Sequence, residues 1–417
     1  MVNHKNLMVA FGVSSALSLM ACVETDSSST PFIVEVLAFS GNDATTGAGI
    51  YALRPVELPA LLSVDPLFDP DFRFIAEPIV DFAALNKITD PDLLLTAVRR
   101  GPTYVPRLRN IDGTLVPRDL LSLQTMSAYV ALRNAADAIP DATGLPRTSI
   151  IPTGGLQVWV KPVFVDGAAS SRMETNAFYL AYTNTFGLLD FSSLERRPLG
   201  ALTPVVTHEF GHHLFHRSFT EADGLCDEFG AGGNYAGRFG NELAIAGINE
   251  GFADWIAFVI VGSTNTLSDA FATEIADPGE RAIDTRLPSA TKFTFDSILT
   301  CTGDFYCIGT LFARSLFEAF VARGGDPNDR TQRMAASRSV FASVKAAPQQ
   351  MRTKMWSRPA IICDTKRSNE IDATVLSGFL GAFVANLPAS ERASVCERFI
   401  VNFGAVGFAS EFRGACL

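Results

Sequence analysis

The stretch Thr207-His208-Glu209-Phe210-Gly211-His212-His213-Leu214-Phe215-His216 contains four of the five histidines in this 417-residue chain. It includes the pattern HExxH, in which two histidines are four positions apart. Residues at that spacing lie on one face of a helix, so the imidazoles of His208 and His212 can bind a single metal ion. Glu209 lies next to that face, where its carboxylate can act as a general base. The stretch therefore predicts a helix that carries a catalytic zinc site.

Two histidines alone do not complete such a site, because catalytic zinc usually has three protein ligands. His213 and His216 lie off the face that the HExxH pair shares, and we expect them to support the site or the fold without binding the metal. Phe215 and Ser218 occupy the positions where the longer pattern with a third histidine requires Gly and His. No histidine follows His216. The third ligand is therefore expected to be an acid.

The strongest acidic candidate lies in the apolar segment Asn249-Glu250-Gly251-Phe252-Ala253-Asp254-Trp255. Glu250 and Asp254 are four positions apart and share one helix face. One of them can bind zinc while the other accepts the distant N–H of a ligating histidine. Among the competing acids between the histidines and this helix, Glu228 is the strongest, although its Gly-rich surroundings are typical of a loop.

The motif HEFGH followed by a helix with NExxAD resembles the gluzincin zinc peptidases, the group of thermolysin and fungalysin. The resemblance covers about residues 120–320. It implies that Glu250 is the third zinc ligand and that Asp254 hydrogen-bonds the first ligating histidine, His208. It also implies an α+β, thermolysin-like fold with a β-rich N-terminal lobe, a helical C-terminal lobe and the zinc helix between them. The gap between His212 and Glu250 is longer than in thermolysin-like enzymes, which indicates an inserted loop.

Two further segments resemble elements of this group. The segment Asn176-Ala177-Phe178-Tyr179 resembles the edge strand along which these enzymes bind the substrate backbone as an added strand, which implies substrate contacts at Asn176 and Ala177. The segment Tyr306-Cys307-Ile308-Gly309 resembles the Tyr-x-x-Gly element of gluzincin aminopeptidases, which implies that the Tyr306 hydroxyl donates to the developing oxyanion. The alternatives are that Tyr306 only packs between neighbouring cysteines, or that Tyr235 has this role.

The chain is expected to have four parts. These are a signal peptide (1–21), a lipidated cysteine and tether (22–48), a β-rich lobe that ends in the HExxH helix (49–218), and a helical lobe with the third ligand (219–417). Strands are expected over 156–165 and 177–182, and strands with loops over 32–118. Apolar periodicity and stop signals such as Pro140, Gly324 and Pro388 predict helices over 122–138, 203–219, 242–261, 305–322, 329–345, 373–387 and 390–402.

The N-terminus has the pattern of an export signal: a charged start, an apolar run over 7–17, and Leu19-Met20-Ala21-Cys22. The run is too short to span a membrane. Its end resembles a bacterial lipobox, which implies that Cys22 is lipidated and anchors the chain in a membrane. Val23 in place of Asp favours the outer membrane or cell surface. The alternative is a plain secreted protein cleaved near Ala21.

Composition limits the class of protein. Apolar residues make up 47% of the chain and charged residues 19%, which excludes a disordered protein. The formal charge of -10 and the pI near 5.1 disfavour a nucleic-acid partner. Six cysteines besides Cys22 allow up to three disulfides in an exported chain, and without a CxxC pair they do not indicate a cysteine zinc site.

These features predict a membrane-tethered zinc endopeptidase that hydrolyses proteins or peptides outside the cytoplasm, with Glu209 as general base. A zinc aminopeptidase is the nearest alternative, because Met173-Glu174-Thr175-Asn176 loosely resembles the amine-binding element of those enzymes. A non-catalytic, zinc-containing binding lipoprotein is the third hypothesis. The presence of Glu209 argues against it, since a scaffold needs ligands but no base. The sequence assigns neither calcium ligands nor an oligomeric state.

Overall fold

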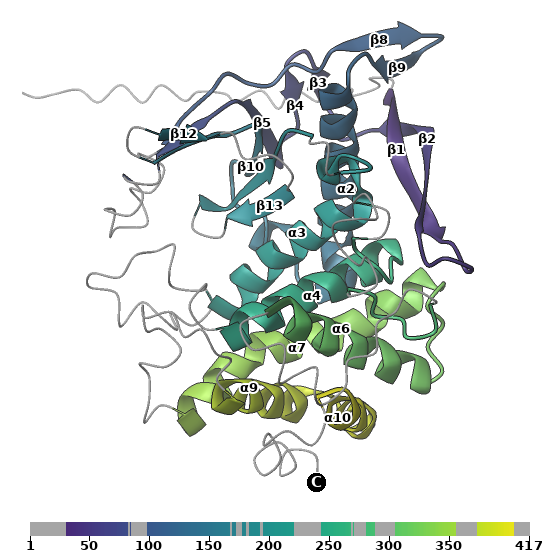
Figure 1. Ribbon diagram of the computed structural model, residues 1–417, viewed down its shortest axis with the longest axis vertical. Helices are drawn as coiled ribbons and strands as arrows, with labels where there is room; N and C mark the ends of the chain where they lie inside the picture. The colour runs from purple at the N-terminus through teal and green to yellow at the C-terminus, as the bar shows by residue number, and fades with distance from the viewer. Residues whose placement is uncertain are drawn as a thin grey trace, which may run out of the picture. The chain divides into compact units, whose positions relative to one another are not determined.

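The computed structural model describes residues 31–81, 84, 98–166, 169–171, 177–180, 183–191, 195–220, 243–267, 270, 281–287, 305–355 and 373–403. Most of the strands come before residue 190, and mainly helices follow (Figure 1). The expected α+β class, with β-sheets in the N-terminal part and helices in the C-terminal part, is confirmed.

Within the described part of the chain, the strands form three sheets. The first has the order β2-β1-β9-β8 and contains β1 (Phe32–Asn42), β2 (Gly49–Leu58), β8 (Leu108–Ile111) and β9 (Thr114–Pro117). The second has the order β13-β14-β10-β5-β4-β3 and contains β3 (Ser63–Val64), β4 (Leu67–Phe68), β5 (Phe72–Ala76), β10 (Leu156–Val160), β13 (Ala177–Leu180) and β14 (Thr185–Leu188). The third has the order β12-β11-β6-β7 and contains β6 (Ile79–Asp81), β7 (Val98–Arg99), β11 (Val163–Asp166) and β12 (Ala169–Ser171). Among the described strands, β13 forms one edge of the second sheet.

Two expectations about the strands need correction. The single strand expected over 156–165 is two strands, β10 and β11, which lie in different sheets. The chain turns between them at Lys161, whose φ is +54°, and at Pro162, which has no N–H to donate to a ladder. The tether expected over 22–48 is also too long, because β1 begins at Phe32 and pairs with β2 along its length.

Most of the described helices agree closely with the expected segments, but the helix expected over 329–345 continues ten residues further, to Met355. The described helices are α2 (Leu120–Thr143), α3 (Thr203–Phe215), α4 (Leu243–Val261), α6 (Phe305–Ala322), α7 (Arg330–Met355), α9 (Ala373–Asn386) and α10 (Ala389–Phe403). Short 3-10 helices η2 (Arg147–Ser149) and η4 (Leu199–Ala201) and a π-helical turn η5 (His216–Thr220) complete them.

The sequence suggested that helix α2 stops at Pro140, but the helix continues past this residue. Pro140 lies inside its last turn, and the helix continues to Thr143. Gly144 then adopts the left-handed conformation, with φ of 73°, and its N–H donates to the Pro140 carbonyl. A proline near a helix end removes only one hydrogen bond, so the glycine cap, and not the proline, ends this helix.

Helices α3 and α4 lie at the centre of the fold. Figure 1 shows α3 between the strands and α4, and α4 between α3 and α6. The stretch Ala244–Val261 is long and apolar enough to cross a membrane, but 78% of it is buried inside the protein. It is therefore the core helix against which α3 and α6 pack.

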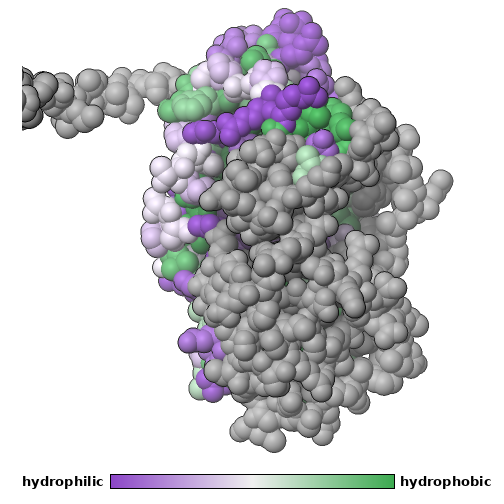
Figure 2. All heavy atoms as spheres, turned by 90° about the vertical axis from the view of Figure 1, so that its left-hand side faces the viewer, coloured by the Kyte–Doolittle hydropathy of each residue, from purple (hydrophilic) through white to green (hydrophobic). Residues whose placement is uncertain are grey.

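On the face shown in Figure 2, the described residues of the upper, β-rich part are mostly hydrophilic, with apolar areas between them.

Glycines allow the backbones of these helices to touch, among them Gly211 and Gly309. A Cβ at Gly211 on α3 would lie 2.6 Å from the Cα of Ala253 on α4. A Cβ at Gly309 on α6 would lie 2.7 Å from the Cβ of Glu250, also on α4. Real Cβ atoms do not approach other atoms so closely, so any side chain at either position must push the helices apart.

We predict that Gly211→Ala destabilises the protein by about 1–3 kcal/mol, the usual cost of overpacking a core, and lowers its zinc content. The reason is that separating α3 from α4 moves His208 and His212 away from Glu250. Urea unfolding and mass spectrometry of the metal test this. Gly144→Ala is the matched control: it costs roughly 1–2 kcal/mol through left-handed strain and leaves the zinc content unchanged. Full zinc content in Gly211→Ala contradicts the prediction.

Candidate metal centre

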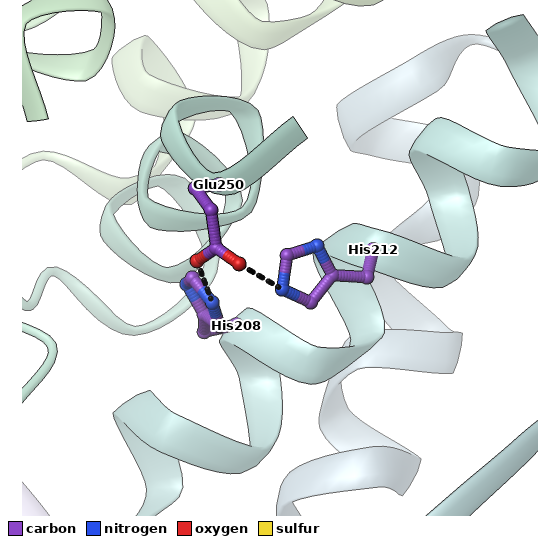
Figure 3. Close-up of side chains that lie close together, drawn as sticks. All are labelled: His208, His212 and Glu250. Atoms are coloured by element: carbon purple, nitrogen blue, oxygen red, sulfur yellow. Dashed lines mark ion pairs between the residues drawn. The ribbon is translucent and has the colours of Figure 1, made fainter. Parts of the chain in front are cut away.

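Three side chains converge where α3 crosses α4. His208 and His212 extend from one face of α3, and Glu250 reaches them from α4 (Figure 3). His208 Nε2 lies 3.2 Å from Glu250 Oε2, and His212 Nε2 lies 3.6 Å from Glu250 Oε1. One possible ligand atom from each residue lies within 4.8 Å of the others, so the three can hold one metal ion.

The spacing and the donor types fit zinc. A tetrahedral zinc ion with bonds of about 2.1 Å keeps its ligand atoms about 3.4 Å apart. The two measured nitrogen–oxygen distances, 3.2 and 3.6 Å, lie on either side of that value. Two imidazoles and one carboxylate also form the ligand set that zinc hydrolases use. The group is therefore a plausible site for one catalytic zinc.

The Nδ1 atoms of both histidines already have hydrogen-bond partners. His208 Nδ1 lies 2.9 Å from Asp254 Oδ1, and His212 Nδ1 lies 3.0 Å from Asn249 Oδ1. These oxygens accept, so each Nδ1 carries the proton and donates it. In the neutral rings the Nε2 lone pairs are then available on the side of Glu250, which is the tautomer that a metal ion requires.

Arg281 joins the two acids of α4. Its Nη2 donates to Glu250 Oε2 at 3.1 Å and to both Asp254 oxygens at 3.0 Å. Thr266 Oγ1 also donates to Asp254 Oδ1, at 2.8 Å. Burial favours the neutral acid, but Arg281 and His208 outweigh it and lower the pKa of Asp254. The pKa of Glu250 is also lowered against burial, by its pairing with His212 and His208 and by the charge of Arg281. Both acids are therefore ionised at neutral pH.

The pKa values of the two histidines are shifted in opposite directions. Burial favours a neutral ring in both. At His208 the carboxylates of Asp254 and Glu250 outweigh burial and raise the pKa to about 9. At His212 burial dominates and, with the positive charge of His208 nearby, lowers the pKa to about 4. A neutral His212 is a ready metal ligand, whereas His208 exchanges a proton for the metal.

Glu209 lies beside the group on α3 and contacts the edge strand β13. The backbone of Tyr179 hydrogen-bonds the Glu209 carboxyl, and a carboxylate only accepts, so the donor is the Tyr179 N–H. Withdrawal from water raises the pKa of Glu209 to about 8, and the nearby charge of Glu250 adds to the shift. Ala177 lies in the same edge strand with its side chain buried. Asn176 lies outside the described residues.

Tyr306 opens α6 with its side chain 45% exposed. Its ring packs against the guanidinium of Arg281, with 4.9 Å from the Arg281 Cζ to the ring centroid. The tyrosine thus borders the metal group through Arg281, and its role toward an oxyanion remains a prediction. Tyr235 and Glu228 lie outside the described residues, as does Cys22.

The cysteines are described only in part. Cys307 and Cys396 are buried and disulfide-bonded. The other five, Cys22, Cys226, Cys301, Cys363 and Cys416, lie outside the described residues. The expected number of disulfides therefore remains a prediction.

His213 and His216 do not belong to the metal group. His213 is fully buried and contacts the Tyr179 hydroxyl and the Ile150 carbonyl. The ring of His216 lies 6.4 Å from that of Tyr179, centroid to centroid. Sequence reasoning missed Arg281, which belongs to no motif and reaches the site from a segment distant in sequence from α4. It placed Tyr179 in the expected edge strand but did not predict that the Tyr179 backbone contacts Glu209.

No family model and no curated protein sequence matches the chain. Among solved structures, it is similar to the precursor of protealysin, a metalloproteinase from Serratia proteamaculans. The sequence identity is 14%, the TM-score is 0.40, and the match covers 81% of this chain and 88% of that chain.

We predict that Glu250→Ala removes most of the bound zinc, because the two histidines alone provide only two of the three protein ligands. Asp254→Ala is expected to weaken zinc affinity by about 10- to 100-fold, the usual cost of losing a partner of a ligand. Mass spectrometry of the purified variants measures both effects. Glu228→Ala is the control and should keep its zinc. The assignment is wrong if Glu228→Ala loses the metal and Glu250→Ala retains it.

Proposed function

We propose that the chain is a zinc peptidase that hydrolyses peptide bonds in proteins or peptides outside the cytoplasm. The observation that carries this proposal is the position of Glu209. It lies directly after a ligand histidine and beside the group formed by His208, His212 and Glu250, and it also contacts the edge strand β13. A site that only stores or binds zinc needs the three ligands but no base at this position.

The residues divide the expected chemistry between them. Zinc, when bound, supplies Lewis acidity that polarises a carbonyl and lowers the pKa of a water. Glu209 takes a proton from the attacking water and delivers it to the leaving amine. Its raised pKa, about 8, suits both steps, because a base that must later act as an acid works best near the working pH. Tyr306 is proposed to donate to the oxyanion.

The edge strand supports a peptide as substrate. Alternate residues of a strand point their backbone groups to the same edge. Because the Tyr179 N–H points to Glu209, the backbone groups of Ala177 face the same side. An extended peptide that pairs with this edge places its backbone alongside Glu209. We therefore propose substrate contacts at the backbone of Ala177. The proposed contact at the preceding Asn176 rests on the sequence resemblance alone.

An endopeptidase is the preferred form of this activity, and an aminopeptidase is the alternative. The two differ in their need for a free amino terminus in the substrate. Hydrolysis of an N-terminally blocked peptide at an internal bond supports the endopeptidase, whereas strict dependence on a free amine supports the aminopeptidase.

The location is proposed from the N-terminal sequence alone. The lipobox-like segment 19–22 supports export and lipidation at Cys22, with anchorage in the outer membrane or at the cell surface. The acidic charge balance supports a protein or peptide partner over nucleic acid.

We predict that Glu209→Gln retains zinc and fold but loses at least about 100-fold in kcat on an N-blocked peptide, since an amide cannot accept the proton. Glu195→Gln is the matched control. Glu195 is another buried glutamate, and its carboxylate accepts the N–H of Leu199, a bond that the glutamine oxygen can keep. This control should leave kcat unchanged. Near wild-type turnover by folded, zinc-loaded Glu209→Gln overturns the mechanism.

We predict that Cys22→Ser abolishes lipidation, because serine has no thiol to modify, and moves the protein out of the membrane fraction. Detergent partitioning and immunoblotting of cell fractions measure this. Anchorage by another segment is shown instead if the variant partitions like the wild type.

A further inference from the structure

His213 follows the second expected zinc ligand directly, yet its imidazole lies among side chains of the β-rich half. Its ring centroid is 5.4 Å from that of Tyr179 on β13 and 6.2 Å from that of Phe186 on β14. The side chain is fully buried. A buried imidazole needs hydrogen-bond partners at its nitrogens, so the partners of His213 show what it holds in place.

Both nitrogens of this ring have a partner. Nε2 lies 3.2 Å from the carbonyl oxygen of Ile150, which only accepts, so Nε2 carries a proton and donates it. Nδ1 lies 3.0 Å from the Tyr179 hydroxyl. In the neutral ring Nδ1 is an acceptor, so it shares the single proton of the hydroxyl with Asn184 Oδ1, which lies 2.8 Å from the same oxygen.

Tyr179 is therefore attached to α3 at two points. Its backbone N–H donates to the carboxylate of Glu209, and its hydroxyl lies within hydrogen-bond distance, 3.0 Å, of His213 Nδ1. Glu209 and His213 are four positions apart, so they lie on one face of α3. One residue of the edge strand thus bridges two residues of one helical turn, which fixes both the distance and the orientation of β13 relative to the zinc helix.

We propose that His213 is a positioning residue that holds Tyr179, and with it the backbone of β13, against the general base Glu209. Without His213 the hydrogen bond from the tyrosine hydroxyl to α3 is lost, whereas the bond to Asn184 stays within the same hairpin and does not hold the strand to the helix. The N–H of Tyr179 then no longer has a fixed position at the Glu209 carboxylate. The proposal rests on the proposed function for its effect on catalysis, but not for its effect on this hydrogen bond.

The competing explanation is that His213 only fills the core. Its neighbours include Phe186 and Phe210, and its bond to Ile150 satisfies a buried carbonyl. Both explanations predict a loss of stability on replacement. They differ in the hydrogen bond of the Tyr179 amide. If His213 only fills the core, its replacement leaves this hydrogen bond unchanged.

The first experiment observes that amide in zinc-loaded, full-length protein. Selective labelling of tyrosine with nitrogen-15 gives signals from seven tyrosines, and the signal missing in Tyr179→Phe is that of Tyr179. In the wild type we expect a downfield proton shift that disappears in Glu209→Gln. His213→Phe, which keeps an aromatic ring, should lose the shift as well. The proposal fails if His213→Phe keeps the wild-type shift.

The second experiment measures hydrolysis by the same proteins. Tyr179→Phe removes only the hydroxyl, and its kcat should fall about 3- to 10-fold, the range for one net hydrogen bond, with KM unchanged. His213→Phe should lower kcat to a similar extent, and the double variant should be no slower than either single variant. Additive losses in the double variant contradict the proposal.

Tyr129→Phe is the matched control for a lost tyrosine hydroxyl. Tyr129 is fully buried on α2, and its hydroxyl donates to Asp69 at 2.7 Å. This variant should lose stability without a change in kcat, which separates positioning from general destabilisation. If His213→Phe does not fold, Tyr179→Phe and Tyr129→Phe still decide the matter, since a fall in kcat in both overturns the proposal.

The two experiments also distinguish this proposal from the proposed function. If the wild type hydrolyses no peptide, the proposed function fails, but the amide shift still tests the link between His213 and Glu209. If the wild type is active and the shift survives in His213→Phe, the positioning role fails while the peptidase remains.

Discussion

The candidate site depends on the contact between the backbones of α3 and α4 at Gly211 and Ala253. His208 and His212 lie on either side of Gly211, and Glu250 and Asp254 lie on either side of Ala253. Helices that carry side chains at their crossing usually keep their axes 8–10 Å apart. Because Gly211 has no side chain, α3 and α4 approach each other closely enough for the imidazoles to contact the carboxylate directly. The glycine in HEFGH is thus as necessary to the geometry as the histidines.

This close packing buries several charges together, and their balance explains why the site suits a divalent cation. Glu250 and Asp254 are ionised, and Arg281 neutralises one of them. With neutral histidines, the group keeps at least one negative charge away from water. An uncompensated buried charge is costly in free energy. The carboxylates therefore raise the pKa of His208, which favours a proton on this ring. A divalent cation in place of this proton compensates the same buried negative charge with two positive charges instead of one.

Sequence patterns predicted those parts of the site that local helix geometry determines. The pairs His208/His212 and Glu250/Asp254 are each four positions apart, and both lie on helices whose limits were expected to within a few residues. Arg281 could not be predicted in this way, since it reaches Asp254 from a separate segment and belongs to no motif. The sheets were less predictable than the helices for the same reason. Strand β10, for example, pairs with β5, where Leu156 lies opposite Phe72, and no local signal specifies so distant a register.

Helix α3 combines two such pairs, and their offset by one residue gives the helix two working faces. One pair, His208 and His212, turns toward α4 and the expected metal. The other pair, Glu209 and His213, contacts the single strand residue Tyr179. Successive residues of a helix differ in direction by about 100°, so the two faces are fixed relative to each other by the helix itself. The base therefore needs no flexible segment to bring it between metal and strand. Any change that rotates α3 alters the metal ligands and the contact with the edge strand together, which makes this one helical turn the rigid link between the zinc group and the proposed path of the peptide.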